Sequence, residues 1–200
     1  MFKAIAALGS VAVKLVYYRG ESEVKANKWH DDPAVLSDTM RRLSCRAGST
    51  QIARVLRLAL AEKERLSGVV LILDHCEERS PFYVAQGLPD ILADRLIEMA
   101  ESLGKRSIPL YIFHEIAVRD TEAIEARPLF RRMAEVSGGV YSEFQSASVA
   151  VLRELLSAVA AFSAAGIEGV KQIEQATTPG ARWLQTRLLL GPAGDFGERR

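Results

Sequence analysis

A short apolar run that ends abruptly in polar residues constrains this chain more than any other feature. Residues 69–73 read VVLIL, and they are followed at once by Asp74, His75, Cys76, Glu77 and Glu78. Such a short run, rich in β-branched side chains, is typical of a strand buried on both faces in the middle of a parallel sheet. Ligands of open α/β sheets bind beyond the carboxyl ends of the strands, so Asp74 is a candidate ligand-binding residue. The alternative is that these polar residues only mark where the chain reaches the surface.

Strand-like and helix-like segments alternate along the rest of the chain. We expect strands over residues 11–18, 24–29, 108–113 and 138–141, and helices over 2–8, 33–43, 51–66, 89–103, 121–136 and 147–164. Ser49 or Thr50 is a suitable N-cap for the helix over 51–66. Pro128 is expected to disturb its helix, and Gly166 is expected to end the last one. The alternation predicts an α/β fold with a doubly wound, mostly parallel sheet and helices on both faces.

Composition excludes several classes of protein. The formal net charge of +1 gives no general attraction to nucleic acid or to a membrane surface. No stretch approaches the roughly 20 apolar residues of a membrane helix. Two cysteines without paired spacing, and no recognisable leader, favour the reducing cytoplasm. We therefore expect a cytoplasmic domain over residues 1–170, followed by a tail over 171–200 with a short amphipathic segment around Trp183.

Other groups of reactive residues give weaker indications. Cys76 beside His75 could form a nucleophile and its base, but adjacent residues at a strand end point apart and no strand–turn–helix elbow surrounds them. The same two residues with His114 could bind zinc, but they lack paired-ligand spacing. The remaining acidic residues at strand ends either add acidity around Asp74 or are solvated loop charges, and these are Glu77, Glu78, Glu115 and Asp120.

Five segments, in order, resemble the von Willebrand factor A (VWA) domain family, and more narrowly bacterial proteins of that type. They read KLVYYRGESEVKANKW, CRAGSTQIARVL, LILDHCEE, IPLYIFHE and MAEVSGGVYSEFQSASVAVLRELLSAVAAF. The resemblance covers about residues 1–170. It implies a Rossmann-like fold with a metal-ion-dependent adhesion site at the top of the sheet. It also implies a protein partner whose carboxylate completes the coordination of the metal.

The resemblance also indicates which parts of that site are present. Thr50 and Asp74 match two of its elements, but the D-x-S-x-S motif that ends the family's first strand does not occur in this sequence. Two protein oxygens are few for Mg²⁺, which takes about six ligands, so we expect weak Mg²⁺ binding at most. The resemblance implies further partner-binding residues near this edge, and these are Ser49, Glu77, Glu78 and Glu115.

The missing motif carries a structural expectation as well. In the family's order the first strand lies between the strands that correspond here to residues 11–18 and 69–73. Without it, two strand edges are left unpaired, and we expect the chain to be poorly stable or oligomeric. The resemblance implies a non-enzymatic protein-interaction module with a degenerate or incomplete metal site. Two alternatives stay open, which are metal-assisted hydrolysis in the acidic crevice and a metal-free scaffold.

Overall fold

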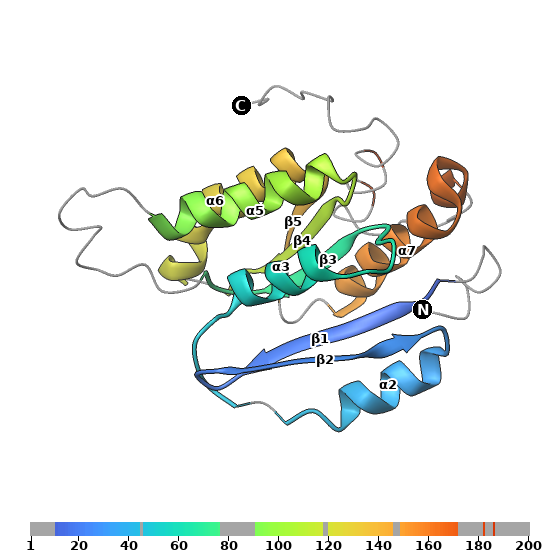
Figure 1. The fold of residues 1–200 in the computed structure, drawn as a ribbon, viewed down its shortest axis with the longest axis horizontal. Coiled ribbons are helices and arrows are strands. Elements are labelled where there is room, and N and C mark those ends of the chain that lie inside the picture. Colours follow the sequence, from blue (N-terminus) through green and yellow to red (C-terminus); the bar gives the residue numbers. More distant parts are fainter. Residues whose placement is uncertain are drawn as a thin grey trace.

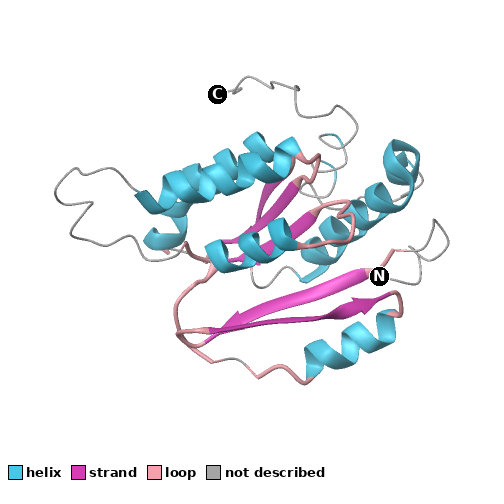
Figure 2. Cartoon of the chain, viewed as in Figure 1, coloured by secondary structure: helices cyan, strands magenta, loops and turns pink. Residues whose placement is uncertain are grey.

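The described residues of this computed structural model form two sheets and a set of covering helices (Figures 1 and 2). The structure describes residues 11–44, 46–76, 91–117, 120–145 and 149–171, together with Arg182 and Thr186. The strands are β1 (Val13–Arg19), β2 (Glu23–His30), β3 (Val69–Leu73), β4 (Leu110–Glu115) and β5 (Val140–Phe144). The helices are α2 (Pro33–Arg41), α3 (Ile52–Ala61), α5 (Ile91–Lys105), α6 (Thr121–Ser137) and α7 (Val149–Lys171).

Strands β3, β4 and β5 form a parallel sheet with β4 in the centre. Successive side chains of a strand point to opposite faces, and both faces are covered. On one face Leu71, Ile112 and Tyr141 pack in a cluster with residues of α3, α5 and α6. On the other face Tyr111 and Phe113 pack against α7. The predicted α/β class, with a parallel sheet and helices on both faces, is confirmed for this part of the chain, as is the pairing of β3 with β4.

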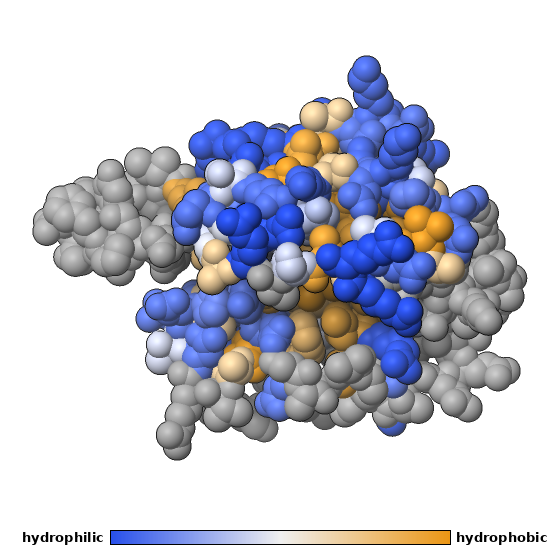
Figure 3. Space-filling view, turned by 90° about the horizontal axis from the view of Figure 1, so that it is seen from below, coloured by the Kyte–Doolittle hydropathy of each residue, from blue (hydrophilic) through white to orange (hydrophobic). Residues whose placement is uncertain are grey.

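The prediction that β3 is buried on both faces is wrong. Val70 and Ile72 are 37% and 45% exposed, whereas Leu71 and Leu73 are buried. The apolar cluster beneath α7 is built from β4, β5 and α7, so this helix covers the centre and the far side of the sheet but leaves β3 bare. Figure 3 shows apolar side chains gathered in a hollow between hydrophilic ones on the face seen from below.

The predicted hairpin of β1 and β2 is confirmed, with Val16 opposite Ala26 and Tyr18 opposite Val24. It forms a sheet of its own, because within the described ranges β1 is paired with β2 alone. In Figure 1, β1 lies between β2 and the parallel sheet and runs in the same direction as β3.

Contacts with α3 and with the segment before it attach the hairpin to the rest of the protein. Lys14 Nζ lies 2.6 Å from Glu62 Oε2, just after the end of α3. Gln51 donates a hydrogen bond from Nε2 to the Gly20 carbonyl oxygen at 3.1 Å. Val16 also packs against the main apolar cluster. The hairpin is therefore held by α3 rather than by sheet hydrogen bonds.

The N-cap of α3 differs from the prediction. Gln51 occupies the cap position without a side-chain cap hydrogen bond. The Ser49 hydroxyl instead donates to Glu21 in the hairpin turn at 2.7 Å. A tertiary partner has therefore replaced the local capping role expected of Ser49 or Thr50. The helix also ends at Ala61, before the predicted boundary at 66.

Proline and glycine act differently in the two C-terminal helices. Helix α6 continues through Pro128, because its buried side, which includes Phe130 and Met133, packs firmly against the core. The range of α7 holds two helical stretches, which are separated by non-helical backbone angles at Ala165 and Gly166. The predicted helix end at Gly166 is therefore confirmed, and a second helical stretch follows it to Lys171. In the part of the chain that the structure describes, no helix has the length and hydropathy needed to span a bilayer.

Candidate functional site

The carboxyl edge of the parallel sheet brings His75 between two carboxylates. Asp74 directly follows β3, and Asp120 precedes α6. His75 Nδ1 lies 3.2 Å from an Asp74 carboxylate oxygen, and His75 Nε2 lies 3.1 Å from an Asp120 carboxylate oxygen. Asp120 is also the N-cap of α6 and accepts a hydrogen bond from the Ala123 amide at 3.0 Å. The imidazole therefore links the end of β3 to the start of α6.

The charges at this edge favour the protonated form of His75. Partial burial acts to lower the pKa of His75, but the charge of Asp74, followed by the hydrogen bond and the charge of Asp120, outweighs burial and raises it. The pKa of Asp120 is lowered, first by the hydrogen bond from the Ala123 amide and further by His75, against the effect of desolvation. A cationic imidazole with two carboxylates gives this group a net charge of −1.

A second histidine, His114 of β4, is completely buried beside this group. Its Nε2 lies 2.7 Å from the Asp74 carbonyl oxygen, which can only accept, so Nε2 carries a hydrogen and donates. Its Nδ1 lies 2.8 Å from the Tyr141 hydroxyl. Burial lowers the pKa of His114, although the hydrogen bond to Asp74 opposes the shift. The ring is therefore neutral, and Nδ1 is an unprotonated acceptor that faces the Tyr141 hydroxyl.

Tyr141 continues this chain of contacts to β5 and α6. Its hydroxyl also lies 3.1 Å from a carboxylate oxygen of Glu143. Glu143 is 2.8 Å from Arg127 Nε and 3.4 Å from an Arg131 nitrogen. Burial raises the pKa of Tyr141, and the negative charge of Glu143 raises it further. The hydroxyl stays protonated at neutral pH, and its one hydrogen faces two acceptors, His114 Nδ1 and Glu143.

The predicted site residues are only partly brought together. The Asp74 side chain, 59% exposed, lies at the predicted edge, but its carboxylate contacts His75. No hydrogen bond or ion pair joins Thr50 to Asp74 among the described residues. Ser49 bonds to the hairpin turn. Glu115 is half-buried at the end of β4. The other two predicted partner-binding residues lie outside the described residues, and these are Glu77 and Glu78.

Among the described residues, no group of side chains is assembled into a magnesium site. Within the described ranges, no three or more histidine, cysteine, aspartate or glutamate side chains are grouped so that they could hold a metal ion. The zinc site considered above, with His75, Cys76 and His114 as ligands, is not assembled either. Both nitrogens of His114 have internal partners, and Cys76 packs against the apolar core. Mg²⁺ needs about six oxygens in near-octahedral geometry, and Asp74 with Thr50 falls far short.

Sequence reasoning missed how these groups pair. Asp120 was expected either to add acidity around Asp74 or to be a solvated loop charge, and its position beside His75, which also contacts Asp74, fits the first interpretation. Its contact with His75 joins residues 45 positions apart, which no local pattern encodes. Tyr141 and Glu143 are two positions apart on one strand and therefore share a face, which is a signal that could have been used. Comparison of the chain with protein-family models, with curated proteins and with solved structures finds no match.

Proposed function

We propose that this chain is a non-enzymatic protein-interaction module of VWA type with a degenerate metal-ion-dependent adhesion site. The observation that carries the proposal is the position of His75 between Asp74 and Asp120. The three groups lie beyond the carboxyl end of a parallel strand, where α/β sheets bind their ligands. In this proposal the imidazolium supplies the positive charge that a divalent ion supplies in a complete site.

The replacement changes what the edge would bind. A metal ion has open coordination positions and accepts a carboxylate from a partner, whereas an imidazolium has two N–H donors and here both face carboxylates. The group keeps a net negative charge, and the Asp74 carboxylate is exposed. A partner would therefore contact this edge through lysine, arginine or hydroxyl groups rather than through a carboxylate.

The same geometry argues against the hydrolase alternative and favours a metal-free scaffold. Metal-assisted hydrolysis needs an ion that activates water, and the ligands for such an ion are not assembled among the described residues. A histidine acting as general base must have a free nitrogen within reach of the nucleophile. Both nitrogens of His75, and both of His114, already face internal partners.

Binding experiments with Asp74→Asn test the proposal. The full chain, immobilised, is used to capture a partner from an extract of its source cells, and direct binding of the purified partner is then measured by calorimetry. We expect binding to persist in EDTA and to weaken about tenfold or more in Asp74→Asn, because a charged hydrogen bond is lost. Asp38→Asn is the control, because Asp38 is an equally exposed acid on α2.

Three results would contradict the proposal. The first is release of the partner by EDTA, because it would restore a metal-dependent site. The second is equal binding by the wild type, Asp74→Asn and Asp38→Asn, because it would place the interface elsewhere. The third is divalent-metal-dependent turnover of a phosphate or ester substrate that is abolished by Asp74→Asn, because it would favour the hydrolase alternative. We also expect Mg²⁺ titration of the isolated chain to show no micromolar affinity.

A further inference from the structure

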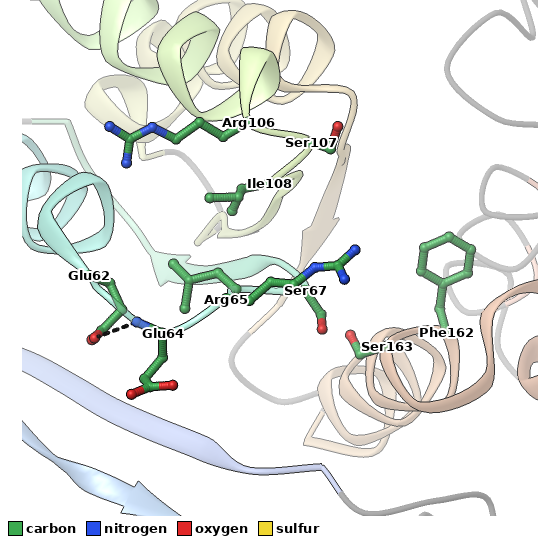
Figure 4. A pocket seen from close by; sticks show the side chains of 10 residues that line it. Glu62, Glu64, Arg65, Ser67, Arg106, Ser107, Ile108, Phe162 and Ser163 are labelled. Carbon is green, nitrogen blue, oxygen red and sulfur yellow. Dashed lines mark hydrogen bonds between the residues drawn. The ribbon is translucent and has the colours of Figure 1, made fainter.

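A pocket of about 530 Å³ lies at the opposite end of the parallel sheet from the carboxyl edge (Figure 4). It is formed where β3 and β4 begin, between the links that precede these strands and helix α7. Its wall includes Arg65 and Ser67 before β3, Ser107 before β4, and Phe162 and Ser163 of α7. The buried side chain of Ile108 adds apolar surface. A pocket of this size suits a small organic molecule.

Arg65 is the basic group of this pocket that has no partner among the described residues. Glu62 is paired with Lys14 at 2.6 Å. Arg106 donates a hydrogen bond to the Leu60 carbonyl oxygen at 2.5 Å, and in Figure 4 its guanidinium points away from Arg65. Arg65 makes no ion pair or hydrogen bond with the described residues. Figure 4 shows its guanidinium extending across the pocket toward Phe162, away from Glu64.

Three serines from three different segments line the pocket, and these are Ser67, Ser107 and Ser163. In Figure 4 Ser67 and Ser163 lie together below the Arg65 guanidinium, whereas the Ser107 hydroxyl lies across the pocket and points away from it. None of the three hydroxyls is hydrogen-bonded to another described residue.

We propose that this pocket binds a small organic phosphate that carries a planar ring. The guanidinium of Arg65 and the hydroxyls of Ser67 and Ser163 are all hydrogen-bond donors, and together they match the oxygens of a phosphate group. The half-buried ring of Phe162 offers a flat apolar surface to the planar part of the ligand. Helix α5 ends beside the pocket, and the carbonyl end of a helix disfavours an anion. Binding of the phosphate therefore depends on the charge of Arg65.

Titrations of the full chain with three probes test this site. Phenyl phosphate carries both features, inorganic phosphate lacks the ring and phenol lacks the anion. Backbone amide shifts followed by NMR report both affinity and location. We expect saturable shifts centred on Ser67, Ser107 and Ser163 with phenyl phosphate, weaker binding of inorganic phosphate, and no saturation with phenol. Absence of saturation by phenyl phosphate at about 10 mM, a concentration that detects even millimolar affinity, would overturn the proposal.

Variants separate a specific site from general attraction of an anion to basic residues. We expect Arg65→Gln to weaken phenyl phosphate binding about tenfold, because the charged hydrogen bonds are lost. Arg106→Gln removes the same charge from the same pocket, but it should leave affinity nearly unchanged because its guanidinium points elsewhere. Equal losses in the two variants would show non-specific attraction and overturn the site.

The site lies away from Asp74, so Asp74→Asn should leave phenyl phosphate binding intact whatever its effect on a protein partner.

Discussion

The β1–β2 hairpin and the β3–β4–β5 sheet pack against the same helix, α3, but they are stabilised differently. Every residue of β4 except Glu115 is buried, whereas no residue of β1 or β2 is fully buried. The parallel sheet has apolar clusters on both faces. The hairpin depends on an ion pair, a few hydrogen bonds and one apolar face. Elements with little burial open locally at low free-energy cost, so the hairpin should be the less stable of the two regions.

Core truncations in the two regions should give the largest difference. Ile112→Ala in β4 removes a completely buried side chain, and we expect it to lower the free energy of unfolding by about 2–5 kcal/mol. Val16→Ala in β1 removes a half-buried side chain, and it should cost about 1 kcal/mol. Urea denaturation followed by circular dichroism measures both. Equal losses would mean that the hairpin is as firmly packed as the sheet.

Alanine substitutions at two tightly packed glycines should show which sheet each contact stabilises, and by how much. A Cβ at Gly139 would lie 1.9 Å from the Leu110 carbonyl oxygen in the parallel sheet, and one at Gly48 would lie 2.1 Å from the Gly20 backbone in the hairpin turn. Overpacking of this kind typically costs about 1–3 kcal/mol. We expect Gly139→Ala to speed amide hydrogen exchange in both sheets.

Gly48→Ala should speed exchange in β1 and β2 and leave β4 protected. Its backbone clash would displace only the contact between the hairpin turn and the segment before α3, which includes the hydrogen bond from the Gly20 amide to the Arg46 carbonyl oxygen at 3.2 Å. Loss of protection in β4 to the same extent would show that the two sheets unfold as a single unit.

The edge of β3 away from β4, which is unpaired among the described residues, should promote self-association. Ile72 is 45% exposed on β3, and an apolar unpaired edge is a template for pairing with another chain. We expect the apparent mass in light scattering to rise with concentration for the wild type and to stay monomeric for Ile72→Lys. Ile124→Lys is the matched control, because Ile124 is similarly exposed on α6. A wild type that is monomeric at every concentration would contradict the prediction.

The smallest expected effect is a pH dependence confined to the parallel sheet. The pKa of His75 is raised in the folded protein, so its contribution to stability is complete below the ordinary histidine pKa of about 6.5. That contribution is lost as the pH rises through the folded-state value. We expect the melting temperature of the wild type to exceed that of His75→Gln at acidic pH, with a difference that shrinks as pH increases. NMR titration of the His75 ring should show a value that falls toward normal in Asp74→Asn, and a value unaffected by Asp74 would contradict this interpretation.

The sequence predicted the positions of strands and helices better than it predicted which of their faces are buried. Periodicity located the hairpin and the parallel strands because these patterns are local. It wrongly predicted two buried faces for β3, because burial of Val70 and Ile72 depends on where α7 lies, about 80 residues further along the chain. Asp74 was placed at the correct edge by a rule about sheets. The contact of His75 with Asp120 and the hydrogen bond from Ser49 to Glu21 are tertiary contacts, and no spacing rule reveals such pairs. The helix predicted over residues 2–8 and the amphipathic segment predicted around Trp183 fall on residues outside the described part of the chain.

Pro128 within α6 has a consequence for the order in which the protein folds. Proline removes a backbone donor and disfavours an isolated helix by about 3 kcal/mol. Helix α6 therefore forms late, when Phe130 and Met133 already have a core to pack against. Asp120 is held at the first turn of that helix, and so the pairing of Asp120 with His75 arises only after the core has assembled. A nascent or partly unfolded chain would keep His75 next to Asp74 but without the Asp120 carboxylate. The complete group proposed to bind a partner would therefore exist only in molecules that have finished folding.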